Sequence, residues 1–282
     1  MRLSLFFLSL FVTLNVFTQE ENCLLWKISG KNLKEPSYLF GTIHITDERV
    51  FQFDSVFNNA FNSCEAYAME LLLDEIDKDD LAEAMLLKKG KVSDYMNDNE
   101  EHILDSVLTE KVGMGLFAFE KMKPFFIYSQ LIQAEMAKDM GEALDMHLLL
   151  RARDQGMLTF GIEKPTEQFS AVDQITIEEQ LDLIFKHIEE ANTPENEMDK
   201  MIEAYLAADL QSLLELVTDT ALPAKFNQAF LIDRNVVMAK RIIKISKKQP
   251  TFHAIGAAHL PGPNGVIALL RKKGYTVEPM CN

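Results

Sequence analysis

Residues 37–44 read SYLFGTIH, a short apolar run that ends in a Gly-x-x-His step. The run has the aromatic and aliphatic character of a β-strand, and Pro36 precedes it as a boundary. The same step returns at residues 256–259, which read GAAH and follow the apolar run TFHAI of residues 251–255. Each His therefore lies just beyond a predicted strand. Because ligands of open α/β sheets bind outside the carboxyl ends of the strands, this pattern predicts a polar site at one sheet edge.

The remaining β signals lie at both ends of the chain and once in the middle. Further predicted strands are residues 23–28, 66–73, 157–162 and 275–280. Helical periodicity fills most of the chain between them, and residues 224–247 predict one long helix. This alternation predicts an α/β fold, with a central mixed β-sheet, flanking helices and a large helical insertion, or cap, at about residues 77–220.

Two glutamates occupy comparable places in the predicted strands. Glu70 interrupts the apolar run of residues 66–73, where a carboxylate is costly to bury unless it is paired, hydrogen-bonded or metal-bound. Glu163 ends the run of residues 157–162. Four strands are therefore expected to bring two His and two Glu to one edge. Two imidazoles and one carboxylate suit a divalent transition metal, and a further carboxylate would serve as general base.

We predict a divalent ion held by His44, His259 and Glu70, with Glu163 as the base or a fourth ligand. Simpler roles stay open for each residue. A His after a Gly turn often makes only a backbone hydrogen bond. Glu70 would point into water if its strand were an edge strand. Independently of that, Glu163 would be only a favourable charge at the start of the next helix.

Composition excludes several classes of protein. The 282-residue chain has 28 Lys and Arg against 43 Asp and Glu, a net charge of −15, which repels phosphate backbones, so no nucleic-acid partner is expected. The sequence contains no H-E-x-x-H, G-x-S-x-G, Walker A or G-x-G-x-x-G motif. Cys23, Cys64 and Cys281 do not cluster in the sequence, which disfavours a thiolate zinc site, and any pairing among them stays open.

The first 19 residues have the layout of a secretory signal. Arg2 precedes an apolar run over residues 3–17, and a polar stretch follows. The run is short for a membrane span, which needs about 20 apolar residues. The cleavage site fits poorly, so an uncleaved N-terminal anchor is the alternative. We expect residues 20–282 to form a single exported domain with no membrane span in the mature chain.

Several short motifs follow one another in a specific order. They are LW at 25–26, SYLFGTIH at 37–44, Glu70, LD at 144–145, GIE at 161–163, DRN at 233–235, GAAHL at 256–260 and GV at 265–266. Over about residues 24–277 this order resembles the TraB/GumN family, which includes the Tiki-type metalloproteases. In its general fold, this family is similar to the erythromycin-esterase and ChaN-like group. One departure is Asp233, where the family often has Glu.

The resemblance implies a metal-dependent, peptidase-like hydrolase that acts on a peptide or protein substrate, with manganese or cobalt favoured and zinc a further candidate. It implies that His44, His259 and Glu70 are essential, and that Glu163 and Arg234 match further family positions. Arg234 would steady a carboxylate or bind a substrate carbonyl or carboxylate. The resemblance also implies a bacterial protein in the periplasm or outside the cell.

Two other functions remain open. One is a ChaN-like protein that holds haem or another ligand without turnover, and the other is an inactive interaction protein that keeps the sheet as a scaffold. The two carboxylates beside two imidazoles favour catalysis, because a haem site needs axial ligation but no spare acid.

Overall fold

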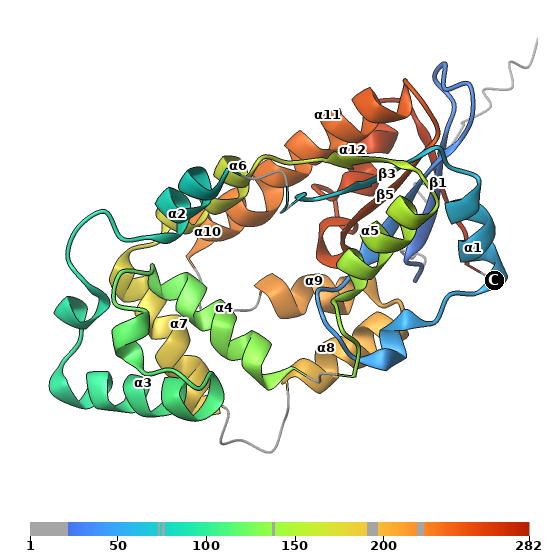
Figure 1. The fold of residues 1–282 in the computed structure, drawn as a ribbon. Helices are drawn as coiled ribbons and strands as arrows, with labels where there is room; N and C mark the ends of the chain where they lie inside the picture. Colours follow the sequence, from blue (N-terminus) through green and yellow to red (C-terminus); the bar gives the residue numbers. More distant parts are fainter. Residues whose placement is uncertain are drawn as a thin grey trace, which may run out of the picture.

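The computed structural model describes residues 22–72, 74, 77–136, 139–190, 197–218 and 223–281. The predicted signal at residues 1–19 lies outside the described residues. The described part has the predicted α/β fold, in which helices flank one mixed sheet and a group of further helices extends beside it (Figure 1).

The sheet has six strands in the order β4-β3-β5-β2-β1-β6. They are β1 (Leu25–Ser29), β2 (Ser37–Thr42), β3 (Ala66–Met69), β4 (Leu158–Gly161), β5 (Thr251–Gly256) and β6 (Thr276–Pro279). The first four in the spatial order run parallel, and β1 and β6 complete the sheet in antiparallel pairs. Central strands of a parallel sheet are covered on both faces, and residues 251–255 of β5 are accordingly all buried. The mixed sheet predicted from the sequence is confirmed.

One predicted strand is shorter than expected. The apolar run of residues 66–73 pairs with its neighbours only as far as Met69. Beyond that point the Glu70 side chain accepts a hydrogen bond from the backbone N–H of Gly256, at 2.7 Å, and the strand ladder stops. Glu70 therefore stands at the end of β3 and not inside it.

Helices connect the strands and make up most of the remaining chain. α1 (Ser55–Asn62) precedes β3, and α12 (Val266–Lys272) joins β5 to β6. Between β3 and β5 the helices are α2 (Lys78–Met85), α3 (Asp98–Lys111), α4 (Pro124–Glu135), α5 (Leu144–Asp154), α6 (Pro165–Phe169), α7 (Ile177–Glu190), α8 (Glu197–Leu206), α9 (Leu210–Thr218), α10 (Ala224–Asn227) and α11 (Arg234–Ser246). No helix of the described residues is long and apolar enough to cross a membrane.

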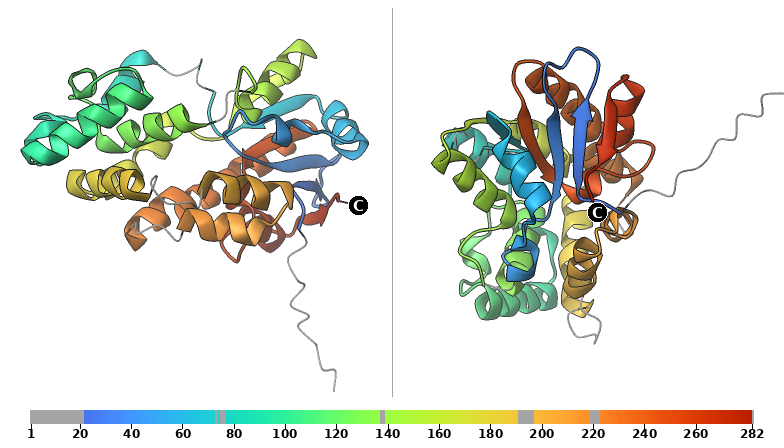
Figure 2. Two further views of the ribbon diagram at one scale, coloured as in Figure 1. Left: turned by 90° about the horizontal axis from the view of Figure 1, so that it is seen from below. Right: turned by 90° about the vertical axis from the view of Figure 1, so that its right-hand side faces the viewer.

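The helices farthest from the sheet have a hydrophobic core of their own. Its buried members include Leu104, Leu108, Ile127, Leu131 and Ile184, which come from α3, α4 and α7. The larger core lies around the sheet and includes Phe61, Tyr67 and Phe252. The two groups of elements are seen side by side in Figure 2. α3, α4 and α7 thus pack on one another around a core separate from that of the sheet.

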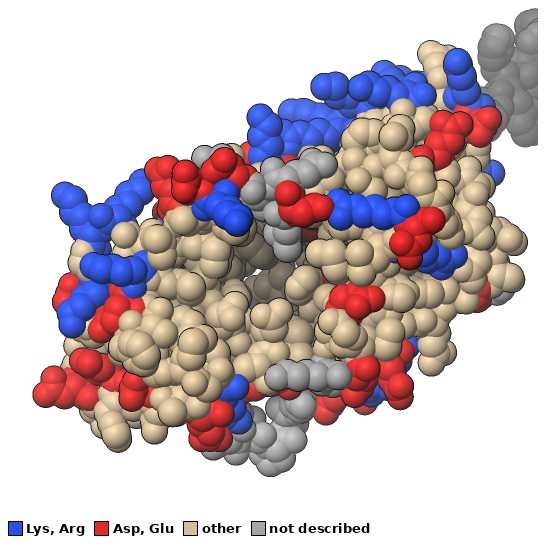
Figure 3. Space-filling model, in the orientation of Figure 1, with Lys and Arg blue, Asp and Glu red and all other residues tan. Residues whose placement is uncertain are grey.

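The long helix predicted at residues 224–247 contains an irregular turn. α10 passes into a π-helical segment, Gln228–Asp233, and then into α11. A π turn carries an extra residue and changes the direction in which the following side chains point. Arg234, the first residue after this turn, is buried. Basic side chains farther along α11 gather on the outer surface of the molecule (Figure 3).

Candidate active site at the sheet edge

The parallel strands deliver the predicted site residues to one edge of the sheet. His44 lies two residues beyond β2, Glu70 directly follows β3, and Glu163 lies two residues beyond β4. His259 ends the 3-10 turn Ala257–His259 that follows β5. Because these four strands are neighbours and run in the same direction, their carboxyl ends meet at this edge.

Arg234 joins the two glutamates. Its Nη2 donates to Glu70 Oε2 at 2.7 Å and to Glu163 Oε2 at 2.6 Å, and its Nε lies 3.1 Å from both oxygens of Glu163. Its Nη1 donates to the Phe230 carbonyl in the π-helical segment at 3.1 Å. Only 4% of the Arg234 side chain is exposed, and none of the Glu163 side chain is. The guanidinium therefore balances two carboxylates in a largely water-free place.

The pKa values of the two carboxylates are shifted in opposite directions. Burial would raise the pKa of Glu70, but the charge of His259 in its protonated form, the charge of Arg234 and the Gly256 N–H bond outweigh burial and lower this pKa below its usual value. Burial raises the pKa of Glu163 despite its bonds to Arg234. Gln168 of α6 adds a weaker contact, since its Nε2 lies 3.3 Å from Glu70 Oε2. Glu70 is thus ionised at neutral pH and held by donors on both oxygens.

His259 is fixed through one ring nitrogen. Its Nδ1 lies 2.6 Å from Oδ1 of Asn235, whose Nδ2 donates to the Asn264 carbonyl at 3.0 Å. Since that amide presents its oxygen to the ring, Nδ1 carries the proton and Nε2 keeps its lone pair. Burial lowers the pKa of His259 to about 4, so the ring is neutral at pH 7. Its Nε2 lies 3.9 Å from Glu70 Oε1.

His44 is held in a similar way but in a more open place. Its Nδ1 lies 2.9 Å from Oδ1 of Asp145 on α5, and 65% of the side chain is exposed. The hydrogen bond to Asp145 raises the pKa of His44 above its usual value. The hydroxyl of Tyr67 donates to the Asp145 carbonyl at 3.1 Å and ties this part of α5 to β3. Nε2 of His44 is left as the ring nitrogen for another ligand.

Close packing explains the glycine of each Gly-x-x-His step. A Cβ on Gly41 would lie 2.8 Å from Cδ1 of Leu260 and 3.0 Å from Cβ of Ala257. A Cβ on Gly256 would lie 3.2 Å from Glu70 Oε1 and 3.5 Å from Cδ2 of His259. Distances below about 3.4 Å are tighter than ordinary carbon contacts. The missing side chains therefore let each strand end approach the residues that form the site.

The donor chemistry of the site fits a divalent ion, although the ligands are not gathered into a complete set. Among the described residues, no three His, Cys, Asp or Glu side chains lie close enough together to hold a metal ion. The structure brings His259 and Glu70 near each other and holds His44 against Asp145. Two metal–ligand bonds of about 2.1 Å span at most about 4.2 Å, which accommodates the 3.9 Å between His259 and Glu70. Metal-binding histidines are commonly oriented by an acceptor on the other ring nitrogen, as both are here.

Three residues of the site were given no role by the sequence analysis. Asp145 and Asn235 anchor the two imidazoles, and Gln168 contacts Glu70. Asp145 and Asn235 stand in the quoted motifs LD and DRN, so the only signal for them was their position in those motifs. Gln168 carried none, because its contact depends on how α6 packs against the sheet.

Comparison with known proteins places the chain in a family. A model of the TraB/PrgY/gumN family matches residues 24–279, so this chain belongs to that family, as the motifs indicated. Metalloprotease TIKI2 of Danio rerio is 24% identical, over 93% of this chain and 62% of the relative. Metalloprotease TIKI1 of Danio rerio is 26% identical, over 91% of this chain and 63% of the relative. Metalloprotease TIKI1 of Homo sapiens is 23% identical, over 92% of this chain and 62% of the relative.

The chain spans about three fifths of the length of the curated relatives it matches. The relatives named above are animal proteins, so they lend no support to the expected bacterial origin. No solved structure matches the chain.

Proposed function

We propose that this protein is a metal-dependent hydrolase of peptide bonds, with its active site at the carboxyl ends of β2, β3 and β5. The observation that carries the proposal is the pair of Gly-x-x-His imidazoles, each anchored through Nδ1 to a side-chain oxygen at the sheet edge where Glu70 lies. The names of the relatives, which are metalloproteases, support the same chemistry.

Three side chains would hold the ion: His44 and His259 through Nε2, and Glu70 through Oε1. Manganese or cobalt is the proposed ion, with zinc as a further candidate. The chemistry that a bound divalent ion supplies is polarisation of the scissile carbonyl and a lowered pKa of a water molecule. Glu70 is ionised at neutral pH, so it offers a charged oxygen either to the ion or to a proton leaving the attacking water.

Glu163 and Arg234 have supporting roles in this proposal. Both oxygens of Glu163 accept from Arg234, and its side chain is fully buried, which argues against direct proton transfer with a substrate. Arg234 in turn fixes Glu70 Oε2, so that Oε1 faces His259. Of the two roles expected for Arg234 from the sequence, the geometry favours the one that steadies a carboxylate. For Glu163 we propose a positioning role toward Arg234 in place of the expected general base or fourth ligand.

The helices inserted at about residues 77–220 would form a cap that controls access to the site. Three of them bring a side chain to the sheet edge. Asp145 of α5 holds His44, Gln168 of α6 contacts Glu70, and the Tyr205 hydroxyl of α8 donates to the Gly41 carbonyl at 2.8 Å. Figure 3 shows a hollow in the surface between the outer helices and the sheet. We propose that these helices select the peptide or protein substrate, while the strand ends carry out the chemistry.

A metal analysis paired with a peptide-library digest tests the function. We expect purified protein to bind one divalent ion and to cleave peptides only with that ion, and we expect His44→Ala to lose cleavage while it stays folded. The matched control is His102→Ala on α3, an exposed histidine away from the site. A Soret band with iron as the bound metal would favour haem binding instead. Folded wild-type protein that neither binds metal nor cleaves would contradict the proposal and favour an interaction protein.

We also propose that the chain is exported, on the evidence of residues 1–19. N-terminal sequencing of the protein from its native host tests this. Export predicts that the mature protein begins near residue 20. A chain that still begins at Met1 and stays in the cytosol would contradict it.

A further inference from the structure

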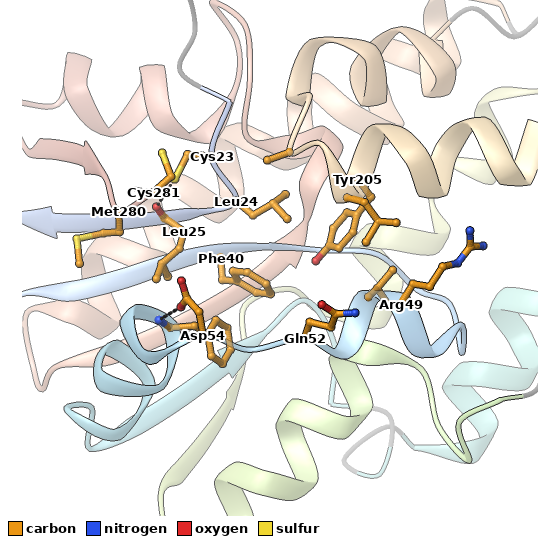
Figure 4. A pocket seen from close by; sticks show the side chains of 14 residues that line it. Cys23, Leu24, Leu25, Phe40, Arg49, Gln52, Asp54, Tyr205, Met280 and Cys281 are labelled. Carbon is orange, nitrogen blue, oxygen red and sulfur yellow. Dashed lines mark hydrogen bonds between the residues drawn. The ribbon is translucent and has the colours of Figure 1, made fainter.

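The two ends of the described chain meet beside a surface pocket. β1 and β6 are antiparallel neighbours, and the Met280 N–H donates to the Leu25 carbonyl at 2.8 Å, just beyond the end of β6. Cys23 lies two residues before Leu25, and Cys281 directly follows Met280. Both line the pocket between β1 and α8, and Figure 4 shows their sulfur atoms next to each other at one end of it.

We propose that Cys23 and Cys281 are a redox-active pair that forms a disulfide, which joins the segment before the first strand to the segment after the last. The inference is independent of the hydrolase proposal, because neither cysteine belongs to the sheet edge that carries the histidines. The sequence left open which of the three cysteines pair, and the proposal assigns Cys23 to Cys281.

The environments of the three thiols determine which of them reacts first in thiol–disulfide exchange. Cys281 is exposed, whereas Cys23 and Cys64 are buried. Burial, with a further contribution from the Cys281 thiol, raises the pKa of Cys23 to about 12, and burial raises the pKa of Cys64 to about 12 as well. Thiolates are the reactive form, so the accessible Cys281 reacts first with a disulfide oxidant.

The oxidant is a small disulfide such as oxidised glutathione. The Cys281 thiolate attacks one sulfur of the oxidant, which forms a mixed disulfide and releases one glutathione thiolate. Cys23 then loses its proton and attacks the Cys281 sulfur, which closes the protein disulfide and releases the second glutathione. The two cysteines are oxidised by two electrons, and one glutathione disulfide is reduced to two thiols. Cys64 has no part in this exchange, because it is buried just beyond the end of α1 and does not line the pocket where Cys23 and Cys281 lie.

Intact-mass analysis of the full chain after incubation with oxidised glutathione tests the pair. We expect wild-type protein to lose two hydrogens, and its free thiols to fall from three to one. Peptide mapping should then recover residue 23 linked to residue 281. Cys23→Ser should instead retain one glutathione on Cys281, since the resolving thiol is gone. Cys281→Ser should take up no glutathione while folded, and Cys64→Ser should close the disulfide as the wild type does.

A stability measurement gives a second readout. Closing a long loop restricts the unfolded chain, so oxidation should raise the thermal midpoint of the wild type and of Cys64→Ser by roughly 5–10 °C. It should leave the midpoint of the other two variants unchanged. Three outcomes would overturn the proposal: a wild-type chain that keeps glutathione on Cys281 without resolving it, one that keeps all three thiols, or one that links Cys64.

Discussion

The guanidinium of Arg234 lies 2.7 Å from a carboxylate oxygen of Glu70, although 164 positions separate the two residues in the sequence. The same group lies 2.6 Å from Glu163, whose side chain is fully buried. A single cation from the start of α11 thus joins the ends of β3 and β4. Without it, the two carboxylates would lose the cation that bonds to both of them.

Arg234→Met should therefore destabilise the protein strongly. Removing one partner of a buried ion pair leaves an uncompensated charge, which typically costs about 3–5 kcal/mol of unfolding free energy. Urea unfolding followed by circular dichroism measures this loss. Adding Glu163→Gln should recover part of the stability, because it removes the buried charge that Arg234 had balanced. The expectation is wrong if the double variant is less stable than Arg234→Met alone. Arg153→Met, at a pair with Asp74 in which 36% and 55% of the two side chains are exposed, should change stability little.

Asp145→Ala should weaken binding of manganese by about 10- to 100-fold, because the loss of an orienting acceptor frees the His44 ring. Isothermal titration calorimetry measures the affinity directly. Glu142→Ala is the matched control, since Glu142 holds Nδ1 of His147 at 3.0 Å in a second His–carboxylate pair. Equal affinities for both variants would show that the Asp145–His44 pair does not support a metal site.

His253 should make the protein less stable in mild acid. It is fully buried on β5, and burial lowers its pKa from 6.5 to about 3. Between pH 6.5 and about pH 3, His253 is protonated in the unfolded chain but not in the folded chain. The free energy of unfolding therefore falls as the pH drops. The contribution amounts to about 2 kcal/mol between pH 7 and pH 5.

Urea unfolding at the two pH values tests this expectation with a pair of variants. His253→Gln keeps a polar partner for Ser246, whose Oγ lies 2.8 Å from Nε2 of the ring, but it does not titrate. Its loss of stability between pH 7 and pH 5 should be smaller than that of the wild type by this amount. His102→Gln, at an exposed histidine, should behave as the wild type does. Equal pH dependence in all three proteins would refute the assignment.

Gly41→Ala should destabilise the protein by about 1–3 kcal/mol, because the new methyl group would overlap Leu260 and Ala257. Gly141→Ala is the control, since a Cβ there meets no atom within 4 Å among the described residues. Thermal unfolding compares the two. A Gly41→Ala protein as stable as the control would mean that β2 and the turn after β5 can move apart freely.

The sequence predicted the sheet well because its strands are short apolar runs with clear boundaries. Each of the six runs overlaps one of the strands, and the order of β and helical signals indicated the α/β class. The early end of β3 could not be predicted, because the apolar run continues beyond it to residue 73. The π-helical segment before Arg234 was also missed, since its residues have ordinary helical periodicity.

The sequence predicted which residues form the candidate site better than it predicted the contacts between them. The Gly-x-x-His steps and Glu70 could be found because each follows an apolar run. The anchors of the imidazoles could not, because Asp145 reaches His44 only after α5 packs against β3. The exposure of His44 and the burial of His259 differ for the same reason: the repeated step places both rings at one edge, and the surrounding helices decide how much of each is covered.

The strand order has a consequence for how the chain folds. β5 lies between β3 and β2, so the two earlier strands cannot be joined until residues 251–256 have been synthesised. Sheets that depend on such distant pairings fold slowly, because the loop-closure entropy is lost before the contacts form. Until then, the apolar edges of β2 and β3 remain without their central partner and are open to aggregation. Assembly of the sheet edge that carries the candidate active site is therefore a late event in folding.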